Sequence, residues 1–247
     1  MVVTMPRYIL SEFNTHRMLS KNSASSRAIP FEKMVESAKN TPFIPIAWQK
    51  DHKGMQGTEY LTDKEIFNTP EQNTSIWLKA RDWAISFAKQ LHQDNKSGVT
   101  KQLCNRLLEP FIYHTVIVTG TEWENFFALR CPKYSLFSEN MPLEFRSKKD
   151  LLKYVKQVEA EEFKNQYDNL TEVEWLQCNK GQADIHMMAT AEAMWDAYNE
   201  STPKELKAGE WHIPFGDNIN TDDLHDFGIV KCDNVYDINE LKILLAV

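Results

Sequence analysis

YHTVIVTGTEWENFFALR, residues 113–130, joins a β-branched run to an amphipathic one. The residues from Tyr113 to Thr119 are rich in Val, Ile and Thr, which predicts a strand. Thr121 and Glu124 have the spacing of a capping box, which predicts a helix over 121–130. Arg130 therefore lies at the end of a helix that follows a strand.

The regions on the N-terminal side of this stretch supply another strand pattern and a polar segment. Residues 2–10 are β-branched and aromatic, and Pro6 restricts them to an edge strand or to the start of a strand. The polar segment 14–27 follows directly, and a strand that leads into a polar turn is a common plan for a binding site. Residues 40–73 are rich in Pro, Asn, Gly and Thr and have no clear period, which predicts a long surface loop.

Two apolar stripes precede the strand 113–119. Thr69 and Pro70 suit the N-cap and the first position of an amphipathic helix that ends near Asn95. Residues 103–111 carry a second helical stripe, which Pro110 is expected to stop. The residues of the first stripe recur at spacings of three and four, as in a helix with one core-facing side: Trp77, Ala80, Trp83, Ala84, Phe87, Ala88 and Leu91.

The regions after residue 131 predict a helical insertion and a core helix. Residues 132–180 are dense in Lys and Glu, with Ser147 capping a predicted helix over 148–163 and Thr171 capping a shorter one. Residues 182–199 have a core-like helical pattern, and 203–216 predict a loop. The last residues, ELKILLAV (240–247), are apolar, so we expect them to dock on the protein or to continue into a longer chain.

The composition is that of a globular, acidic protein. The chain has 247 residues, of which 42% are hydrophobic, enough for one sizeable core or two small ones. Asp and Glu outnumber Lys and Arg by 35 to 28, which gives a net charge of -7 and argues against a general nucleic-acid coat. Because no apolar run is long enough to span a membrane and no signal-peptide pattern is present, we expect a cytoplasmic protein without a membrane partner.

The cysteines and histidines form no metal-ligand pattern. Cys104, Cys131, Cys178 and Cys232 are widely spaced, so we expect free thiols, with Cys131 a minor candidate for a nucleophile. The sequence contains no HExxH motif, and the acidic run 217–223 lacks the ligand spacing of an EF-hand. No metal site is predicted.

Residues 15–27, THRMLSKNSASSR, form the densest polar cluster of the chain. Two arginines among small hydroxyl side chains and backbone amides are suited to bind a phosphate group. The alternative is a solvated serine-rich loop, because the segment has no glycine-rich phosphate motif. The polar residues of the cluster include His16, Arg17, Ser20, Asn22, Ser25, Ser26 and Arg27.

Arg106 and Arg130 both lie among apolar residues. A buried guanidinium without a counter-charge is unfavourable by several kcal/mol, so each of them requires an anion. The anion is either a ligand or a structural partner, and Glu109 and Glu124 are the structural candidates.

Five blocks in the same order resemble flavin-dependent thymidylate synthases, most closely the phage-type members. They cover most of the chain outside residues 40–100 and 132–180. The resemblance implies an α+β fold, with helices packed on a mainly antiparallel sheet, in a single domain over residues 1–247. The blocks are THRMLSKNSASSRAIP (15–30), QLCNRLLEPF (102–111), VTGTEWENFFALRC (118–131), GQADIHMMATAEAM (181–194) and GEWHIPF (209–215).

The same resemblance implies conversion of dUMP to dTMP. Methylenetetrahydrofolate would supply the carbon, FAD and NADPH would supply the reducing power, and the sites would form between subunits of a homotetramer. Arg130 would be the catalytic residue, since a fixed cation stabilises negative charge on the activated uracil ring. The nucleotide contacts would be Ser25, Ser26, Arg27, Arg106 and Arg130, and the flavin contacts His16, Arg17, Asn22 and Asn125.

The chain departs from the family pattern at several positions. Thr15, Ser23 and Ala28 replace family residues, so the contacts of those side chains are not carried over. Gln182 matches a family glutamine within an altered stretch. The family's HxTPFEH or HxSPFEH flavin-binding segment has no match, which predicts a truncated or split member.

Three functional hypotheses therefore stay open. The first is the thymidylate synthase itself. The second keeps the fold but makes another C5-modified pyrimidine nucleotide, because Ser23 and Ala28 could reshape the site. The third is a nucleotide-binding remnant or partner subunit without activity of its own, which would bind dUMP but no flavin.

Overall fold

The structure is a computed structural model that describes residues 1–208 except 54–56, 94–97, 138–141, 159–166 and 168. Residues Met1–Ser201 form one compact unit that combines helices with small antiparallel sheets. The predicted acidic run 217–223, the apolar end 240–247 and Cys232 lie outside the described residues.

A three-stranded antiparallel sheet lies at the centre of this unit. β3 (Tyr113–Thr119) is its middle strand, between β1 (Val2–Pro6) and β2 (Ser20–Ser23). The predicted strand over 113–119 is confirmed, and the strand that contains Pro6 lies at an edge, as expected. The short strand β2 within the polar segment was not predicted, because its sequence SKNS carries no apolar alternation.

The first predicted strand is shorter than its sequence suggested. After Pro6 the chain turns into the 3-10 helix η1 (Arg7–Ile9) and the short helix α1 (Leu10–Phe13). Ile9 and Phe13 are both buried, since a spacing of four residues puts both side chains on one face of a helix. The strand prediction over 7–10 was therefore wrong.

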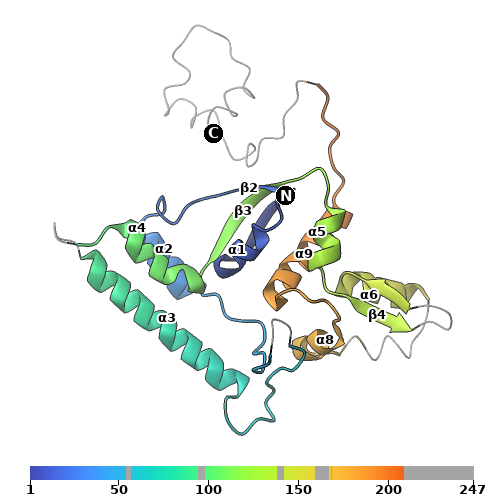
Figure 1. Cartoon of the computed structure of the whole chain (residues 1–247), viewed down its shortest axis with the longest axis horizontal. Coiled ribbons are helices and arrows are strands. Elements are labelled where there is room, and N and C mark those ends of the chain that lie inside the picture. The colour runs from blue at the N-terminus through green and yellow to red at the C-terminus, as the bar shows by residue number, and fades with distance from the viewer. Residues whose placement is uncertain (54–56, 94–97, 138–141, 159–166, 168, 209–247) are drawn as a thin grey trace. The chain divides into compact units, whose positions relative to one another are not determined.

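The main core forms where two helices pack on the sheet. α5 (Glu124–Arg130) and α9 (Ile185–Glu200) contact each other, as Figure 1 shows. They bury alternate residues of the strands together with their own apolar side chains. The largest contributors are Val3, Met5, Phe13, Val116, Val118, Phe126, Phe127 and Met187.

Three of the four predicted helix N-caps are confirmed, and one is wrong. Thr69, Ser147 and Thr171 each accept a backbone hydrogen bond at a helix N-terminus, as predicted. The predicted capping box of Thr121 with Glu124 is wrong. α5 begins after Trp123, and the Glu122 carboxylate accepts the bond from the Glu124 N–H at 2.8 Å instead.

A second core lies between α2 (Phe31–Asn40), α3 (Pro70–His92), α4 (Lys101–Cys104) and the 3-10 helix η2 (Asn105–Phe111). Figure 1 shows α3 alongside α2 and α4. Helix α2 was not predicted, although Phe31, Met34, Val35 and Ala38 have helical spacing and are buried. Pro110 lies inside η2 and does not stop it.

Only part of the apolar face of α3 reaches this core. Trp77, Ala84 and Ala88 pack into it, whereas Trp83 and Phe87 are exposed. The prediction of one core-facing stripe is therefore wrong for four of its seven members, because Ala80 and Leu91 are exposed as well.

In the residues that the structure describes, the insertion 132–180 contains a β-hairpin beside its helices. β4 (Tyr134–Phe137) pairs with β5 (Pro142–Phe145), and α6 (Lys148–Gln157) and α8 (Glu172–Cys178) follow. The helices that Ser147 and Thr171 cap were predicted and the hairpin was not, and residues 159–163 of the helix predicted over 148–163 lie outside the described residues. The insertion has a small core of its own, formed by Tyr134, Leu136, Leu151, Val155 and Trp175.

The remaining predictions concern the loop, the last helix and the membrane. Residues 41–69 form no helix or strand where they are described, apart from a bridge between Gln49 and Tyr60. The core helix predicted over 182–199 is present as α9. Among the described residues, no helix is both long and apolar enough to cross a membrane.

Candidate functional site

A cavity of about 240 Å³ lies between the turn after α1 and the helix α5. The turn and the helix are far apart in the sequence, and the central sheet brings them together. Four of the residues predicted to contact substrate or cofactor line this cavity. Its lining is Thr15, His16, Arg17, Met18, Leu19, Glu122, Asn125, Phe126, Leu129 and Arg130.

Aromatic packing fixes the turn against α5. Phe13 is buried and meets Phe126 edge to face, with 5.6 Å between the ring centroids. His16 meets the same ring at 4.9 Å. The buried side chain of Leu19 anchors the other end of the turn, and the Leu19 N–H donates to the His16 carbonyl at 3.3 Å. The polar residues of the turn are therefore held beside Arg130.

Three side chains of this N-terminal region share the Arg130 guanidinium. Its Nε donates to Nε2 of His16 at 2.7 Å, its Nη1 pairs with the Glu12 carboxylate, and its Nη2 donates to the Thr15 hydroxyl at 3.3 Å. A guanidinium has five N–H groups. Two of them have no partner among the described residues, so Arg130 can still bind an anion or a carbonyl oxygen.

The structural partner of Arg130 is not the one the sequence suggested. Glu124, the expected candidate, pairs with Arg146. Glu12 takes its place, and it was missed because sequence spacing cannot relate α1 to the end of α5. The expected partner of Arg106 is correct, since Arg106 lies 3.7 Å from Glu109.

The protonation of the site follows from its burial. Desolvation, Arg130 and Lys21 all lower the pKa of His16. Its imidazole is therefore neutral near pH 7, and because Nε2 accepts from Arg130, the proton is assigned to Nδ1. Burial raises the pKa of the Glu12 carboxyl, and Arg130 opposes that shift.

The predicted phosphate residues form a separate group. The Asn105 amide donates to the carbonyls of Ser26 at 2.7 Å and Ile29 at 3.1 Å, which holds residues 25–29 against η2, close in the chain to Arg106. Ser25 and Arg27 are exposed, and the Ser25 hydroxyl accepts from the Arg27 N–H at 3.3 Å.

The structure does not bring that group into the Arg130 cavity. None of Ser25, Ser26, Arg27 and Arg106 lines it. The Ser26 hydroxyl is buried, and it has no hydrogen-bond partner among the described residues. Asn22 is exposed on β2, where it faces Ile117 across the register, and it does not line the cavity either.

A polar cluster that the sequence analysis missed lies at the start of α9. Asp184 caps the helix by accepting from the N–H groups of His186 and Met187. The Tyr8 hydroxyl hydrogen-bonds Nδ1 of His186, and the Ile46 N–H donates to its Nε2 at 3.2 Å. The available sequence signal was Asp184 directly before a helical pattern.

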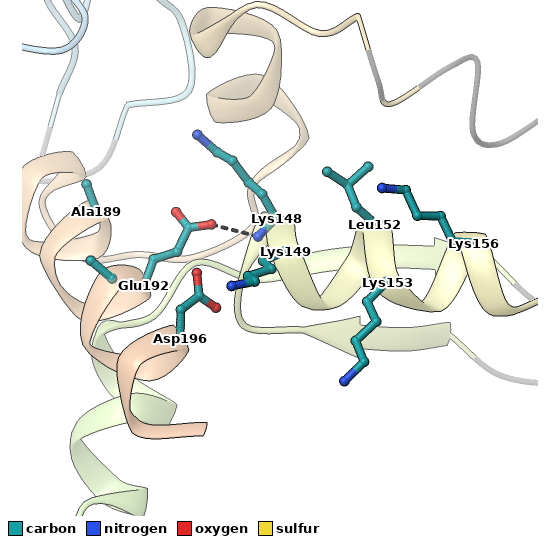
Figure 2. A pocket seen from close by; sticks show the side chains of 9 residues that line it. Lys148, Lys149, Leu152, Lys153, Lys156, Ala189, Glu192 and Asp196 are labelled. Carbon is teal, nitrogen blue, oxygen red and sulfur yellow. Dashed lines mark hydrogen bonds between the residues drawn. The ribbon is translucent and has the colours of Figure 1, made fainter. Parts of the chain in front are cut away.

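A larger cavity of about 670 Å³ lies between α6 and α9, as Figure 2 shows. Lysines project from α6, and Glu192 and Asp196 project from α9, so its two walls carry opposite charges. Lys148 already pairs with Glu172. No predicted site residue lines this cavity, so the smaller one around Arg130 is the candidate site.

The other reactive groups offer no alternative centre among the described residues. Cys104, Cys131 and Cys178 are free thiols, and burial raises the pKa of Cys131 to about 12, which disfavours a thiolate nucleophile. No group of three or more His, Cys, Asp or Glu side chains in the described part could hold a metal ion.

Comparisons of the chain with protein-family models, with curated proteins and with solved structures gave no match. The arrangement of the residues and the sequence resemblance are therefore the basis of the functional proposal.

Proposed function

We propose that this chain acts as a flavin-dependent thymidylate synthase, which transfers a one-carbon unit from methylenetetrahydrofolate to C5 of dUMP. The observation that supports this proposal is the meeting of His16, Arg17, Asn125 and Arg130 around one cavity. The sequence resemblance had singled out these four residues from two distant blocks.

The chemistry of the cavity suits a uracil ring. Arg130 is held by neighbours at three of its N–H groups and keeps two for a ligand. A fixed cation in a partly dry site stabilises negative charge that develops on a ring carbonyl without reorganising. The Asn125 carboxamide lines the same space and can both donate and accept a hydrogen bond.

The fit to FAD is partial. Pockets for drug-sized ligands, which are smaller than FAD, have volumes of roughly 300–1,000 Å³, whereas this cavity measures about 240 Å³. It accommodates one ring system and not a whole dinucleotide, so other groups must complete the site. In the proposed enzyme, FAD reduced by NADPH supplies the hydride, and a homotetramer in the cytoplasm shares its sites between subunits.

Tritium release from C5-labelled dUMP tests the proposal, with FAD, NADPH and methylenetetrahydrofolate present. The wild-type chain should release tritium, and Arg130→Ala should lower the rate by at least a hundredfold, as loss of an electrostatic contact to the transition state does. Arg146→Ala is the matched control, because Arg146 also pairs with a glutamate and is similarly shielded, yet it does not line the cavity. Equal rates for the two variants would contradict the role of Arg130.

A second candidate function is a nucleotide-binding partner subunit without activity of its own. The small volume of the cavity favours it, as does the separation of Ser25 and Arg106 from Arg130. A visible spectrum taken after addition of FAD and desalting distinguishes the two. A retained flavin band supports the synthase, whereas a colourless protein that binds dUMP supports the partner subunit. If turnover occurs, the mass of the product nucleotide shows whether the C5 substituent is methyl.

A further inference from the structure

Helix α3 carries an exposed apolar stripe that no other described element covers. Ile76 is 59% exposed, Trp83 68%, Phe87 56% and Leu91 44%. Exposed apolar side chains are normal when scattered, but a contiguous row on one helix is a mark of an interaction surface. In Figure 1, α3 lies at an edge of the compact unit, with α2 and α4 along it.

The stripe has the spacing of a helix-pairing seam. Ile76, Ala80, Trp83 and Phe87 follow one another at steps of four, three and four residues, which is the repeat of helices that pack along each other. The polar residues beside this seam are Gln72, Lys79, Ser86 and Gln90, so only one of them is charged. Depletion of charge is typical of the centre of a protein interface.

We propose that α3 pairs antiparallel with α3 of a second copy of this chain. In a two-fold register centred between Ala80 and Trp83, each Trp83 lies opposite the Ala80 of the other copy, and each Ile76 lies opposite the other Phe87. A large side chain then meets a small one at the centre, twice by symmetry, as a self-complementary interface requires. The antiparallel arrangement also aligns the two helix dipoles favourably.

The area of the stripe is sufficient for such a dimer. An aromatic side chain buries about 150–250 Å² when covered. With more than half of Trp83 and Phe87 exposed, the stripe offers on the order of 500 Å² per copy, so that complete pairing covers about 1,000 Å², the threshold for a biological interface. The proposed homotetramer requires self-association but names no interface, and this inference assigns one from α3 alone, which lies outside the five blocks of the resemblance.

The oligomeric state of the full chain is the first test. Sedimentation should show a dimer or a multiple of it, and Trp83→Glu should weaken the association at least tenfold. Phe67→Glu is the matched control, since Phe67 is 80% exposed and lies outside the seam. A wild-type monomer at tens of micromolar, or an unchanged assembly of Trp83→Glu, would overturn the proposal.

A second variant tests whether weaker association results from the lost contact and not from misfolding of the monomer. Ala80→Trp keeps the seam apolar and changes an exposed position, so the monomer should fold with an unchanged circular dichroism spectrum. In the proposed register, the new tryptophan at position 80 lies opposite Trp83 of the other copy, and the two indoles collide. Ala80→Trp should therefore weaken the dimer at least tenfold, as Trp83→Glu does. A dimer as tight as that of the wild type contradicts this register.

The antiparallel orientation of the two α3 helices is tested with a spin label attached to the cysteine of Glu71→Cys. Cys178 and Cys232 are replaced by Ser in this variant. In the antiparallel register, residue 71 lies opposite residue 92 of the other copy. At a rise of 1.5 Å per residue, the two labels are then about 30 Å apart along the helix axis. A separation of about 10 Å indicates a parallel pair and overturns the proposal.

Discussion

Arg130 shows how a single residue acquires a defined position. Its sequence neighbours are apolar and predict only that a counter-charge is required. The structure supplies Glu12, His16 and Thr15, all from one short segment. Thr15 is one of the positions where the chain departs from the pattern of the synthases that it resembles, and its hydroxyl accepts one of the three hydrogen bonds.

At the residue scale, Glu192 gives the protein a pH-dependent stability. Burial raises the pKa of Glu192 to about 7, against about 4.3 in an unfolded chain. The folded state therefore binds a proton that the unfolded state has lost, and this contribution is full below about pH 4.3 and disappears as the pH rises through about 7.

Glu192→Gln imitates the protonated form and should remove that dependence. Urea unfolding at about pH 8 should find the variant more stable by about 1–2 kcal/mol, a value reduced because Glu192 is partly exposed, with little difference at about pH 4. Asp82→Asn, at an exposed position, controls for the loss of one charge. A constant difference between the variant and the wild type at both pH values would contradict the prediction.

At the element scale, loss of the N-cap side chain should destabilise the protein more at α9 than at α3. Asp184→Ala removes the acceptor for two N–H groups and a contact to His186, so the free energy of unfolding should fall by about 1–2 kcal/mol. Thr69→Ala, at the exposed cap of α3, should lower the free energy of unfolding by less, about 0.5–1 kcal/mol.

Asp184→Asn separates capping from charge, because asparagine caps a helix about as well as aspartate. Chemical denaturation of the three variants measures the difference. Equal losses for Asp184→Asn and Asp184→Ala would show that the carboxylate charge, and not the capping hydrogen bonds, stabilises this end of α9.

The elements differ in how well their sequences predict them. Thr69, Ser147 and Thr171 mark helix starts, because a cap is a contact between residues two or three apart. The strand β2 escaped prediction, since its stability comes from pairing with β3, about a hundred residues further along the chain. Local patterns carry no record of those partners.

At the scale of the whole molecule, association through α3 should make the thermal midpoint depend on protein concentration. A ligand or partner that binds only the folded chain stabilises it by mass action. The Tm of the wild type should rise by about 2 °C for each tenfold increase in concentration. Differential scanning calorimetry of Trp83→Glu should give a midpoint that changes less with concentration than that of the wild type; an equal rise in that variant would contradict association through α3.

The sequence by itself determined the strand over 113–119, three helix caps and the residue types of a polar site, because these depend on neighbours along the chain. The tertiary structure decided which of these residues meet. It joined His16 to Arg130, left Ser26 buried elsewhere, and exposed Trp83 although its spacing suggested a core position. The physical reason is that burial and ion pairing depend on distance in space, and the central sheet sets that distance for segments far apart in the chain.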